Sequence, residues 1–362
     1  MEELRLDNNN LTELPTSINK LKNLVRLHLY SNRLTELPAE IGDLKKLNGL
    51  YVSSNQLVSL PTSVQTLNQL EVLELDDNKI TELPSEIGDL KKLKKLYVYS
   101  NQLVGLPTSI QKLHQLQNLN LDNNTLTELP AVIGDLKQLK SLFVINNRLV
   151  GLPTSIKKLN QLEVLNLNGN QLTDLPAEIG SLQKLKRLIV SNNQIISLPT
   201  SILKLNHLEQ LLLDGNKLTE LPVEIGNLKK LRKLDVRNNQ LVSLPTSIQK
   251  LNQLEKLHLN DNKFTELPSE IGDLKKLRTL NVSHNQLVSL PTSIQKLNQL
   301  EELHLYGNKF TELPSEIGDL KKLRSLNVRY NPLLSDVILA LEMEKKGMTS
   351  LVVAGGCGNN FQ

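Results

Sequence analysis

A period of 23 residues constrains this chain more than any other feature of its sequence. Counting Met1 as position 1, the segment Leu254–Lys276 shows the pattern: leucines at positions 1, 4 and 6, Leu-Pro at 14 and 15, isoleucine at 18 and leucine at 21. Fourteen of the 15 prolines, from Pro15 to Pro314, keep the same step. An asparagine occupies position 9 of every repeat: Asn9, Asn32, Asn55, Asn78, Asn101, Asn124, Asn147, Asn170, Asn193, Asn216, Asn239, Asn262, Asn285, Asn308 and Asn331. A fixed period of this kind predicts one repeat solenoid rather than several globular domains.

Within each repeat, positions 2 to 7 alternate between outward and inward residues, which predicts a short β-strand with positions 4 and 6 facing the core. Strands of successive repeats should lie parallel, about 4.8 Å apart. We expect the position 9 asparagines to be buried and to hydrogen-bond the backbone of neighbouring coils, because buried polar groups need partners. The prolines at position 15 fix φ where the chain turns, and positions 18 and 21 return as a helical or 3-10 turn.

The Leu-Pro-x-x-Ile-x-x-Leu half of each repeat, as in Leu267–Leu274, resembles the 23-residue class of the leucine-rich repeat family. That class occurs in Ras-suppressor-type proteins, plant intracellular Ras-group proteins and many bacterial repeat proteins. The resemblance extends from Met1 to about Leu333. It implies an α/β-type repeat solenoid, a right-handed superhelix with a parallel concave sheet of about 15 strands and short helical or 3-10 turns on the convex side. The matching residues are scaffold residues, so they do not identify a ligand.

The two ends of the chain differ from the repeat. We predict a solenoid over 1–333 and a C-terminal helical cap and tail over 334–362. Ser335–Gly347 has the features of a capping helix, with an N-terminal serine, an apolar stripe and a terminal glycine. A short strand is expected over 351–353.

At the N-terminus, Met1 falls on position 1, so the chain starts in phase with the repeat and no polar cap precedes it. Core leucines such as Leu4 and Leu6 would then be exposed to water, which repeat proteins normally avoid. A fragment, a frayed end, or an end covered by another molecule explains this equally well. The sequence is therefore compatible with a monomer or with an end-to-end dimer through the first coil.

The repeats are of two kinds that alternate, which makes a larger unit of 46 residues. Lys263–Arg278 recurs unchanged at Lys309–Arg324, and Asn239–Glu255 recurs at Asn285–Glu301. Because in-register coils place each residue beside its own copy, a single kind of repeat would stack like charges. In this chain acidic and basic residues largely alternate at positions 2 and 20 instead. Avoidance of that repulsion and simple duplication of a 46-residue block are both compatible with this pattern.

The composition excludes several classes of function. The net charge of +4 comes from 42 basic and 38 acidic residues, whereas a general nucleic-acid binder needs a densely basic face. Cys357 is the only cysteine, so no internal disulfide can form, and this favours a reducing compartment. No apolar run approaches the roughly 18 residues of a membrane span, and the N-terminus has no signal-peptide pattern. We expect a cytoplasmic protein, or one secreted without a cleaved signal into a host cell.

No set of residues has the spacing of a catalytic or metal site. The P-loop pattern of a fused GTPase is absent, and no histidine lies near Cys357 in sequence. His258 and His304 share position 5 with Asn281 on the strand between them, about 9.6 Å apart, which is too far for one zinc ion. They are expected to face solvent or a ligand. We expect no catalytic residues, no metal and no cofactor.

The aromatic residues give the strongest functional signal. All six tyrosines fall at position 5, 7 or 8, on or beside the outward face of the sheet, whereas Phe264 and Phe310 take core position 11. Amphipathic aromatics on an exposed face are typical of binding hot spots, although drift at strand positions that favour aromatics would give the same pattern. Together with a charged patch in the C-terminal half, they form the candidate partner-binding set: Tyr30, Tyr51, Tyr97, Tyr99, Phe143, Ile189, Leu212, Arg237, His258, His304 and Tyr306.

These observations favour a non-enzymatic scaffold that binds a protein partner on its concave face. Near-identical repeats rich in lysine and asparagine are typical of a bacterial protein, and an effector that acts on a host protein fits this pattern, as does a designed consensus sequence. Two other hypotheses stay open: a surface adhesin that binds host matrix or glycan, and the recognition domain of a larger enzyme.

Overall fold

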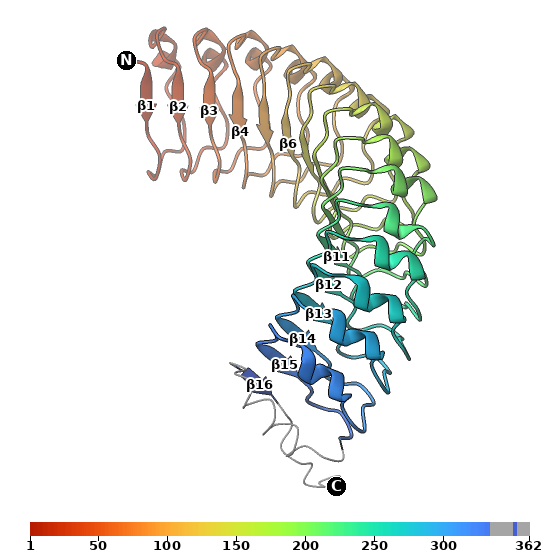
Figure 1. Cartoon of the computed structure of the whole chain (residues 1–362). Coiled ribbons are helices and arrows are strands. Elements are labelled where there is room, and N and C mark those ends of the chain that lie inside the picture. Colours follow the sequence, from red (N-terminus) through yellow and green to blue (C-terminus); the bar gives the residue numbers. More distant parts are fainter. Residues whose placement is uncertain (334–349, 353–362) are drawn as a thin grey trace, which may run out of the picture. The chain divides into compact units, whose positions relative to one another are not determined.

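The computed structural model describes residues 1–333 and 350–352 of the chain. The described residues form two compact units, one over 1–187 and one from 188 onward. Each unit is a series of coils in which a three-residue strand alternates with a short 3-10 helix. Figure 1 shows that, within each unit, the strands line the inner side of the coils and the 3-10 helices line the outer side.

In the first unit, the strands pair in parallel and in sequence order, each residue beside its counterpart 23 residues later, as in Leu50 beside Leu73. The strands are β1 (Glu3–Arg5), β2 (Arg26–His28), β3 (Gly49–Tyr51), β4 (Val72–Glu74), β5 (Lys95–Tyr97), β6 (Asn118–Asn120), β7 (Ser141–Phe143) and β8 (Val164–Asn166). The 3-10 helices are η1 (Thr16–Lys20), η2 (Ala39–Asp43), η3 (Thr62–Thr66), η4 (Ser85–Asp89), η5 (Thr108–Lys112), η6 (Ala131–Asp135), η7 (Thr154–Lys158) and η8 (Ala177–Ser181).

The second unit repeats this arrangement, beginning at the boundary strand β9 (Arg187–Ile189). Its further strands are β10 (Gln210–Leu212), β11 (Lys233–Asp235), β12 (Lys256–His258), β13 (Thr279–Asn281), β14 (Glu302–His304), β15 (Ser325–Asn327) and β16 (Ser350–Val352). Its 3-10 helices are η9 (Thr200–Lys204), η10 (Ile225–Asn227), η11 (Thr246–Lys250), η12 (Ser269–Asp273), η13 (Thr292–Lys296) and η14 (Ser315–Asp319). The predicted parallel sheet and short outer turns are confirmed.

The leucine pattern produces the core of each coil. Leucines at position 4, such as Leu96 and Leu119, are fully buried, while the residues on either side face outward. Pro107 precedes η5 with φ −66° and ψ 145°, and its carbonyl accepts the first hydrogen bond of the turn from Ile110. The proline ring holds φ near this value, so Pro107 both ends the extended segment and begins the 3-10 turn.

The position 9 asparagines form the predicted ladder between coils. In the first unit, Asn124 Nδ2 donates to the carbonyl oxygens of Val98 at 2.9 Å and Leu121 at 3.0 Å, and its Oδ1 accepts from the backbone N–H of Leu103 at 2.9 Å. In the second unit, Asn262 makes the same set of bonds. These side chains supply partners to backbone groups that leave the sheet, so each coil is tied to the one before it.

The alternation of two repeat kinds has a steric basis that the charge pattern did not reveal. A Cβ atom on Gly88 at the end of η4 would lie 2.8 Å from the Cβ of Ser109 in η5, and the same glycine-serine contact joins Gly134 to Ser155. In the second unit, Gly272 meets Ser293 in this way. The outer helices therefore pack in close pairs, each of which needs a glycine in one repeat and a small residue in the next.

The alternating charges also form ion pairs between coils. Lys94 lies 2.9 Å from Glu71, and Lys158 lies 3.2 Å from Asp135. The side chains of these pairs are exposed, so each contributes only a few tenths of a kcal/mol.

The ends of the chain show a mixed outcome. Leu4, Leu6 and Leu11 are partly exposed, as expected for an open first coil, whereas Leu14 and Ile18 are buried with 6% exposure each. The strand expected over 351–353 is found as β16, which pairs with β15. The capping helix predicted over 335–347 lies outside the described residues.

Candidate binding surface

The inner face of the first unit is formed by the outward side chains of β1–β8. Across this face, Tyr51 pairs with Glu74, Glu74 with Tyr97, Tyr97 with Asn120, and Asn120 with Phe143. These side chains are half-buried, because each is flanked by its neighbours about 4.8 Å away on both sides. The row is therefore both accessible and held in place by lateral packing.

The tyrosines face outward, as the sequence predicts. Tyr30, Tyr51, Tyr97 and Tyr99 are half-buried, Tyr306 in the second unit is half-buried as well, and Tyr330 is exposed. By contrast, Phe264 and Phe310 are fully buried, as expected for core position 11. Packing of the core does not require these tyrosines, so their presence needs another explanation.

Several carboxylates lie among these aromatic rings without a cationic partner. Burial raises the pKa of Glu74, and Lys95 is the nearby charge that opposes this shift. Burial also raises the pKa of Asp122, while hydrogen bonds from Ile145 N and with Asn120 lower it. Burial raises the pKa of Asp76 to about 7; the hydrogen bond from the backbone N–H of Tyr99 lowers that pKa, and the charges of Glu74 and Asp77 raise it. The charged forms of these groups are incompletely compensated within the chain.

The pKa of Asp76 predicts a pH dependence of stability. From about pH 4, where an unfolded aspartate titrates, up to about pH 7, the folded state holds a proton that the unfolded state has lost. The contribution of Asp76 is therefore full at about pH 4 and below, and it is lost as the pH rises to about 7. We expect Asp76→Asn to stabilise the protein relative to wild type at pH 8 by on the order of 2 kcal/mol, and by less at pH 4. Urea unfolding at both pH values measures this, and an equal difference at the two would contradict it.

One member of the inner face was missed by the sequence analysis. The imidazole of His28 stacks on the ring of Tyr51, with centroids 4.5 Å apart and planes 6° from parallel, and its Nε2 lies 3.3 Å from Glu3. His28 and Tyr51 both occupy position 5 of successive repeats, so the 23-residue step was a signal that could have found this contact.

The inner face of the second unit is more charged. Asp235 is almost fully buried, and Arg237 Nε lies 3.5 Å from it, with Lys233 at 3.7 Å. Burial lowers the pKa of the adjacent His258, while the charge of Asp235 raises it. Here the buried carboxylate has cationic partners in the chain itself.

The other candidates of this unit are dispersed. His258 and His304 lie on either side of Asn281, as predicted. Tyr306 contacts His284 and Tyr330 edge-on, at 4.6 and 4.9 Å between ring centroids. Leu212 is half-buried, whereas Ile189 is only 8% exposed and offers little surface to a partner.

Models of two families of leucine-rich repeat match the chain. The model described as "Leucine-rich repeat region" matches residues 2–76, 201–264 and 256–341, and the model described as "Leucine rich repeat" matches 68–126, 114–172 and 160–218. A leucine-rich repeat protein from Leptospira interrogans is 38% identical, with a TM-score of 0.86 over 96% of this chain and 94% of that chain. The chain belongs to the leucine-rich repeat family.

Other leucine-rich repeat structures resemble this chain over part of their length. The Arabidopsis receptor kinase HAESA, solved with the peptide hormone IDA and the co-receptor SERK1, is 31% identical with a TM-score of 0.75, and the match covers 91% of this chain and 58% of that chain. The ectodomain of GASSHO1/SCHENGEN3 from Arabidopsis thaliana, solved with CASPARIAN STRIP INTEGRITY FACTOR 2, is 32% identical with a TM-score of 0.60, and the match covers 98% of this chain and 50% of that chain. No curated protein sequence matches the chain.

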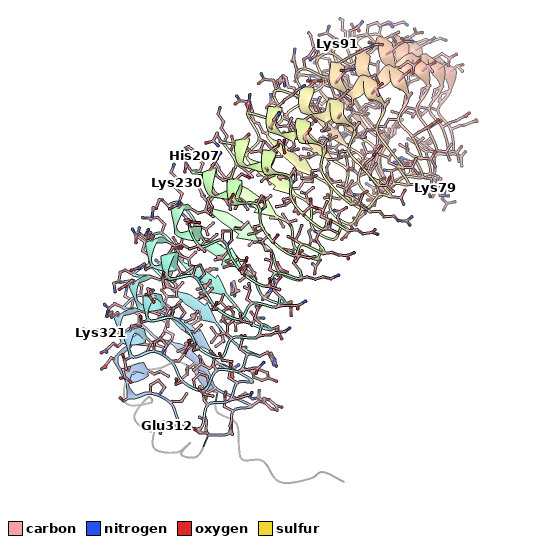
Figure 2. The ribbon with its side chains drawn as sticks, turned by 90° about the vertical axis from the view of Figure 1, so that its right-hand side faces the viewer. Lys79, Lys91, His207, Lys230, Glu312 and Lys321 are labelled. Atoms are coloured by element: carbon pink, nitrogen blue, oxygen red, sulfur yellow. The ribbon has the colours of Figure 1, made fainter. Side chains whose placement is uncertain are left out.

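Away from the inner face, the lysines of this leucine-rich repeat protein are largely engaged by the chain. Figure 2 shows Lys79 and Lys91 on opposite edges of the first unit. Lys79 Nζ donates to Gln56 Oε1 at 3.2 Å, and Lys91 Nζ donates to the carbonyl oxygen of Gly88 at 2.6 Å, at the end of η4. These cations stabilise the coils and do not reach the inner-face carboxylates.

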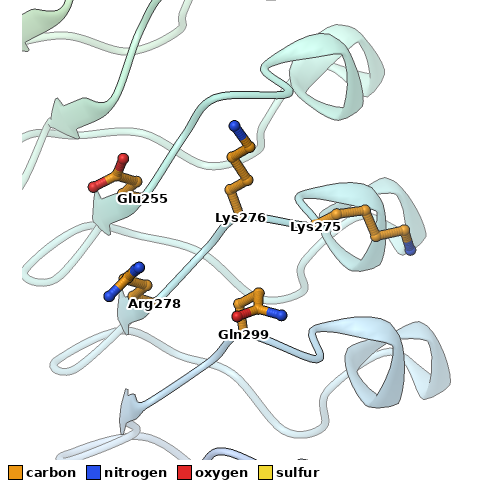
Figure 3. Close-up of a pocket in the computed structure, with 5 residues that line it drawn as sticks. All are labelled: Glu255, Lys275, Lys276, Arg278 and Gln299. Atoms are coloured by element: carbon orange, nitrogen blue, oxygen red, sulfur yellow. The ribbon is translucent and has the colours of Figure 1, made fainter.

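An open groove of ≈ 400 Å³ in the second unit is lined by Glu255, Lys275, Lys276, Arg278 and Gln299 (Figure 3). Lys276 Nζ donates to Gln253 at 2.6 Å, and Arg278 lies 3.4 Å from Glu301. Arg278 thus belongs to a charge pair between coils, whereas Lys276 donates to an uncharged amide of the preceding coil and Lys275 contacts Gly272 and Asp273 of its own coil. Within residues 1–333 and 350–352, no group of three or more histidines, cysteines and acidic residues is placed to hold a metal ion, and no helix is long and apolar enough to cross a membrane.

Proposed function

We propose that this protein is a non-enzymatic scaffold whose inner face binds a protein partner. The observation that carries the proposal is the row Tyr51, Tyr97 and Phe143, three half-buried rings at the same position of alternate strands. Half-exposed aromatic rings fixed by their neighbours lose little side-chain entropy on binding, which is why such residues dominate protein interfaces.

The comparisons support this proposal in general terms. The receptor kinase HAESA was solved with a peptide hormone and a co-receptor, and the GASSHO1/SCHENGEN3 ectodomain was solved in complex with CASPARIAN STRIP INTEGRITY FACTOR 2; both share the coil geometry of this chain. The 38% identity to a Leptospira protein supports a bacterial origin. We further propose that the protein acts in a reducing compartment, either the bacterial cytoplasm or a host cell that it enters without a cleaved signal as an effector. The single cysteine supports this assignment.

Removal of two rings of the row tests the inner face. We expect the double substitution Tyr97→Ala and Phe143→Ala to weaken binding to a partner by about 2 kcal/mol, or roughly thirtyfold, because interface aromatics carry a large share of binding energy. The partner is captured with the intact chain, identified, purified and titrated by calorimetry against both forms.

The same two coils supply a matched control. Val104 and Val150 are 66% and 62% exposed and occupy position 12, away from the strand face. The double substitution Val104→Ala and Val150→Ala should leave the affinity unchanged. If the valine variant lost binding and the aromatic variant kept it, the partner would bind the flank and the proposal would be wrong.

A further inference from the structure

The inner face from β3 to β7 is acidic as well as aromatic. At positions 5, 7 and 8 of these five coils the chain has four carboxylates, Glu74, Asp76, Asp77 and Asp122, and no lysine, arginine or histidine. None of the four has a cation at ion-pairing distance among the described residues. The second unit differs, since Asp214 and Asp235 there pair with Arg237. Lys95, at position 3 of β5, lowers the pKa of Glu74 but forms no ion pair with it. This part of the inner face therefore keeps negative charge that a partner's cations would neutralise.

The aromatic rings on this face have a regular spacing. Tyr51, Tyr97 and Phe143 lie at the same strand position on every second strand, which places them about 9.6 Å apart. Glu74 lies between the first two rings, and Asn120 lies between the second and third, with Asp122 two residues further along the chain. At this strand position an aromatic ring and a polar side chain therefore alternate from one coil to the next.

This period matches one backbone conformation of a peptide. A polyproline II helix has three residues per turn and a rise of about 3.1 Å per residue, so every third side chain returns to the same side after about 9.3 Å. The difference between the ring spacing of about 9.6 Å and the peptide repeat of about 9.3 Å adds up to only about 0.6 Å from the first ring to the third. An extended β-strand would present side chains on one side every 6.6 to 6.8 Å or so and would lose this match.

We propose that the β3–β7 inner face binds a polyproline II segment of a partner protein that carries lysine or arginine at every third residue. One cation would lie over Glu74 between the rings of Tyr51 and Tyr97, and the next would lie near Asp122 between the rings of Tyr97 and Phe143. Each cation gains an acidic partner and two ring faces. This inference rests on the proposed function, because it specifies the partner of the same face.

The test compares two peptides of identical composition. The first is a fluorescent (Pro-Pro-Arg)5 peptide, and the second has the same ten prolines and five arginines with all arginines grouped at one end. Fluorescence anisotropy with the full chain at pH 8 should give saturable binding of the first peptide, at least about tenfold tighter than the second. Equal affinities, or no binding of the regular peptide, would overturn the proposal, because general charge attraction would bind the grouped arginines at least as tightly as the spaced ones.

A pair of variants locates the binding site. Glu74→Gln with Asp122→Asn should weaken binding of the regular peptide at least about tenfold. The control, Glu86→Gln with Asp89→Asn, changes the net charge equally on η4, on the outer side of the coils, and should leave the affinity within about twofold. Equal losses in both variants would show nonspecific attraction and would refute the site.

This experiment separates failure of the inference from failure of the proposed function. A captured protein partner that depends on Tyr97 and Phe143, together with no binding of (Pro-Pro-Arg)5, would leave the inner face as a binding surface for a partner of other chemistry. Loss of both kinds of binding would remove the proposed function as well. If the charge variants fail to fold by circular dichroism, the comparison of the two peptides with wild type still decides the question.

Discussion

Replacement of Asn124 by alanine is expected to lower the free energy of unfolding by about 4 kcal/mol. The amide of Asn124 bonds to the carbonyl oxygens of Val98 and Leu121 and to the backbone N–H of Leu103, at 2.9 to 3.0 Å. Alanine leaves the N–H of Leu103 without a partner, which costs about 1 to 3 kcal/mol. The carbonyl oxygens of Val98 and Leu121 keep their bonds from Asn101 and Asn147, so each loses one of two bonds, at about 0.5 to 1.5 kcal/mol. Urea unfolding followed by far-UV circular dichroism measures the loss, and faster hydrogen exchange at the amide of Leu103 would locate it.

The first repeat supplies the matched control for this prediction. Asn9 occupies the same repeat position but is exposed, and its amide donates only to the carbonyl oxygens of Leu6 and Asp7 within its own coil. Water can replace those bonds, so Asn9→Ala should cost less than about 1 kcal/mol. Similar losses for the two substitutions would mean that asparagine acts through local turn preference and does not act through the bonds between coils.

The asparagine ladder was predictable from the sequence because a fixed step places identical residues side by side. The same reasoning placed the tyrosines on the outward face and Phe264 in the core, where it is fully buried. The step also implied the stacking of His28 on Tyr51, which the sequence analysis overlooked.

Other features depend on distances that the repeat pattern does not contain. The pattern assigned both Ile189 and Leu212 to the partner-binding set, but Ile189 is only 8% exposed while Leu212 is half-buried. The pKa of Asp76 near 7 likewise reflects local burial. The contact of Gly134 with Ser155 follows from how closely the outer helices approach, which a charge pattern cannot show.

That close approach predicts that Gly134→Ala will destabilise the protein by about 3 kcal/mol. The added Cβ would lie 2.8 Å from the Cβ of Ser155 and 3.0 Å from its carbonyl carbon. Backbone atoms of η7 cannot move aside as a flexible side chain would, so η6 and η7 must separate and strain the coils between them. Thermal and urea unfolding of the purified chain measure the effect, and the loss should appear without any change at the inner face.

Gly151 gives the matched control one coil further along the chain. A Cβ there meets nothing within 4 Å, because this glycine borders an open groove beside Val150. Its φ is not positive, so alanine fits its backbone and restricts only the unfolded chain, and Gly151→Ala should be neutral or stabilise by up to about 1 kcal/mol. If Gly134→Ala lowers the free energy of unfolding and Gly151→Ala does not, the close spacing of the outer helices is the reason that one kind of repeat has glycine at the position of Gly134. A small effect at Gly134 would mean that duplication and charge pairing explain the 46-residue unit without steric selection.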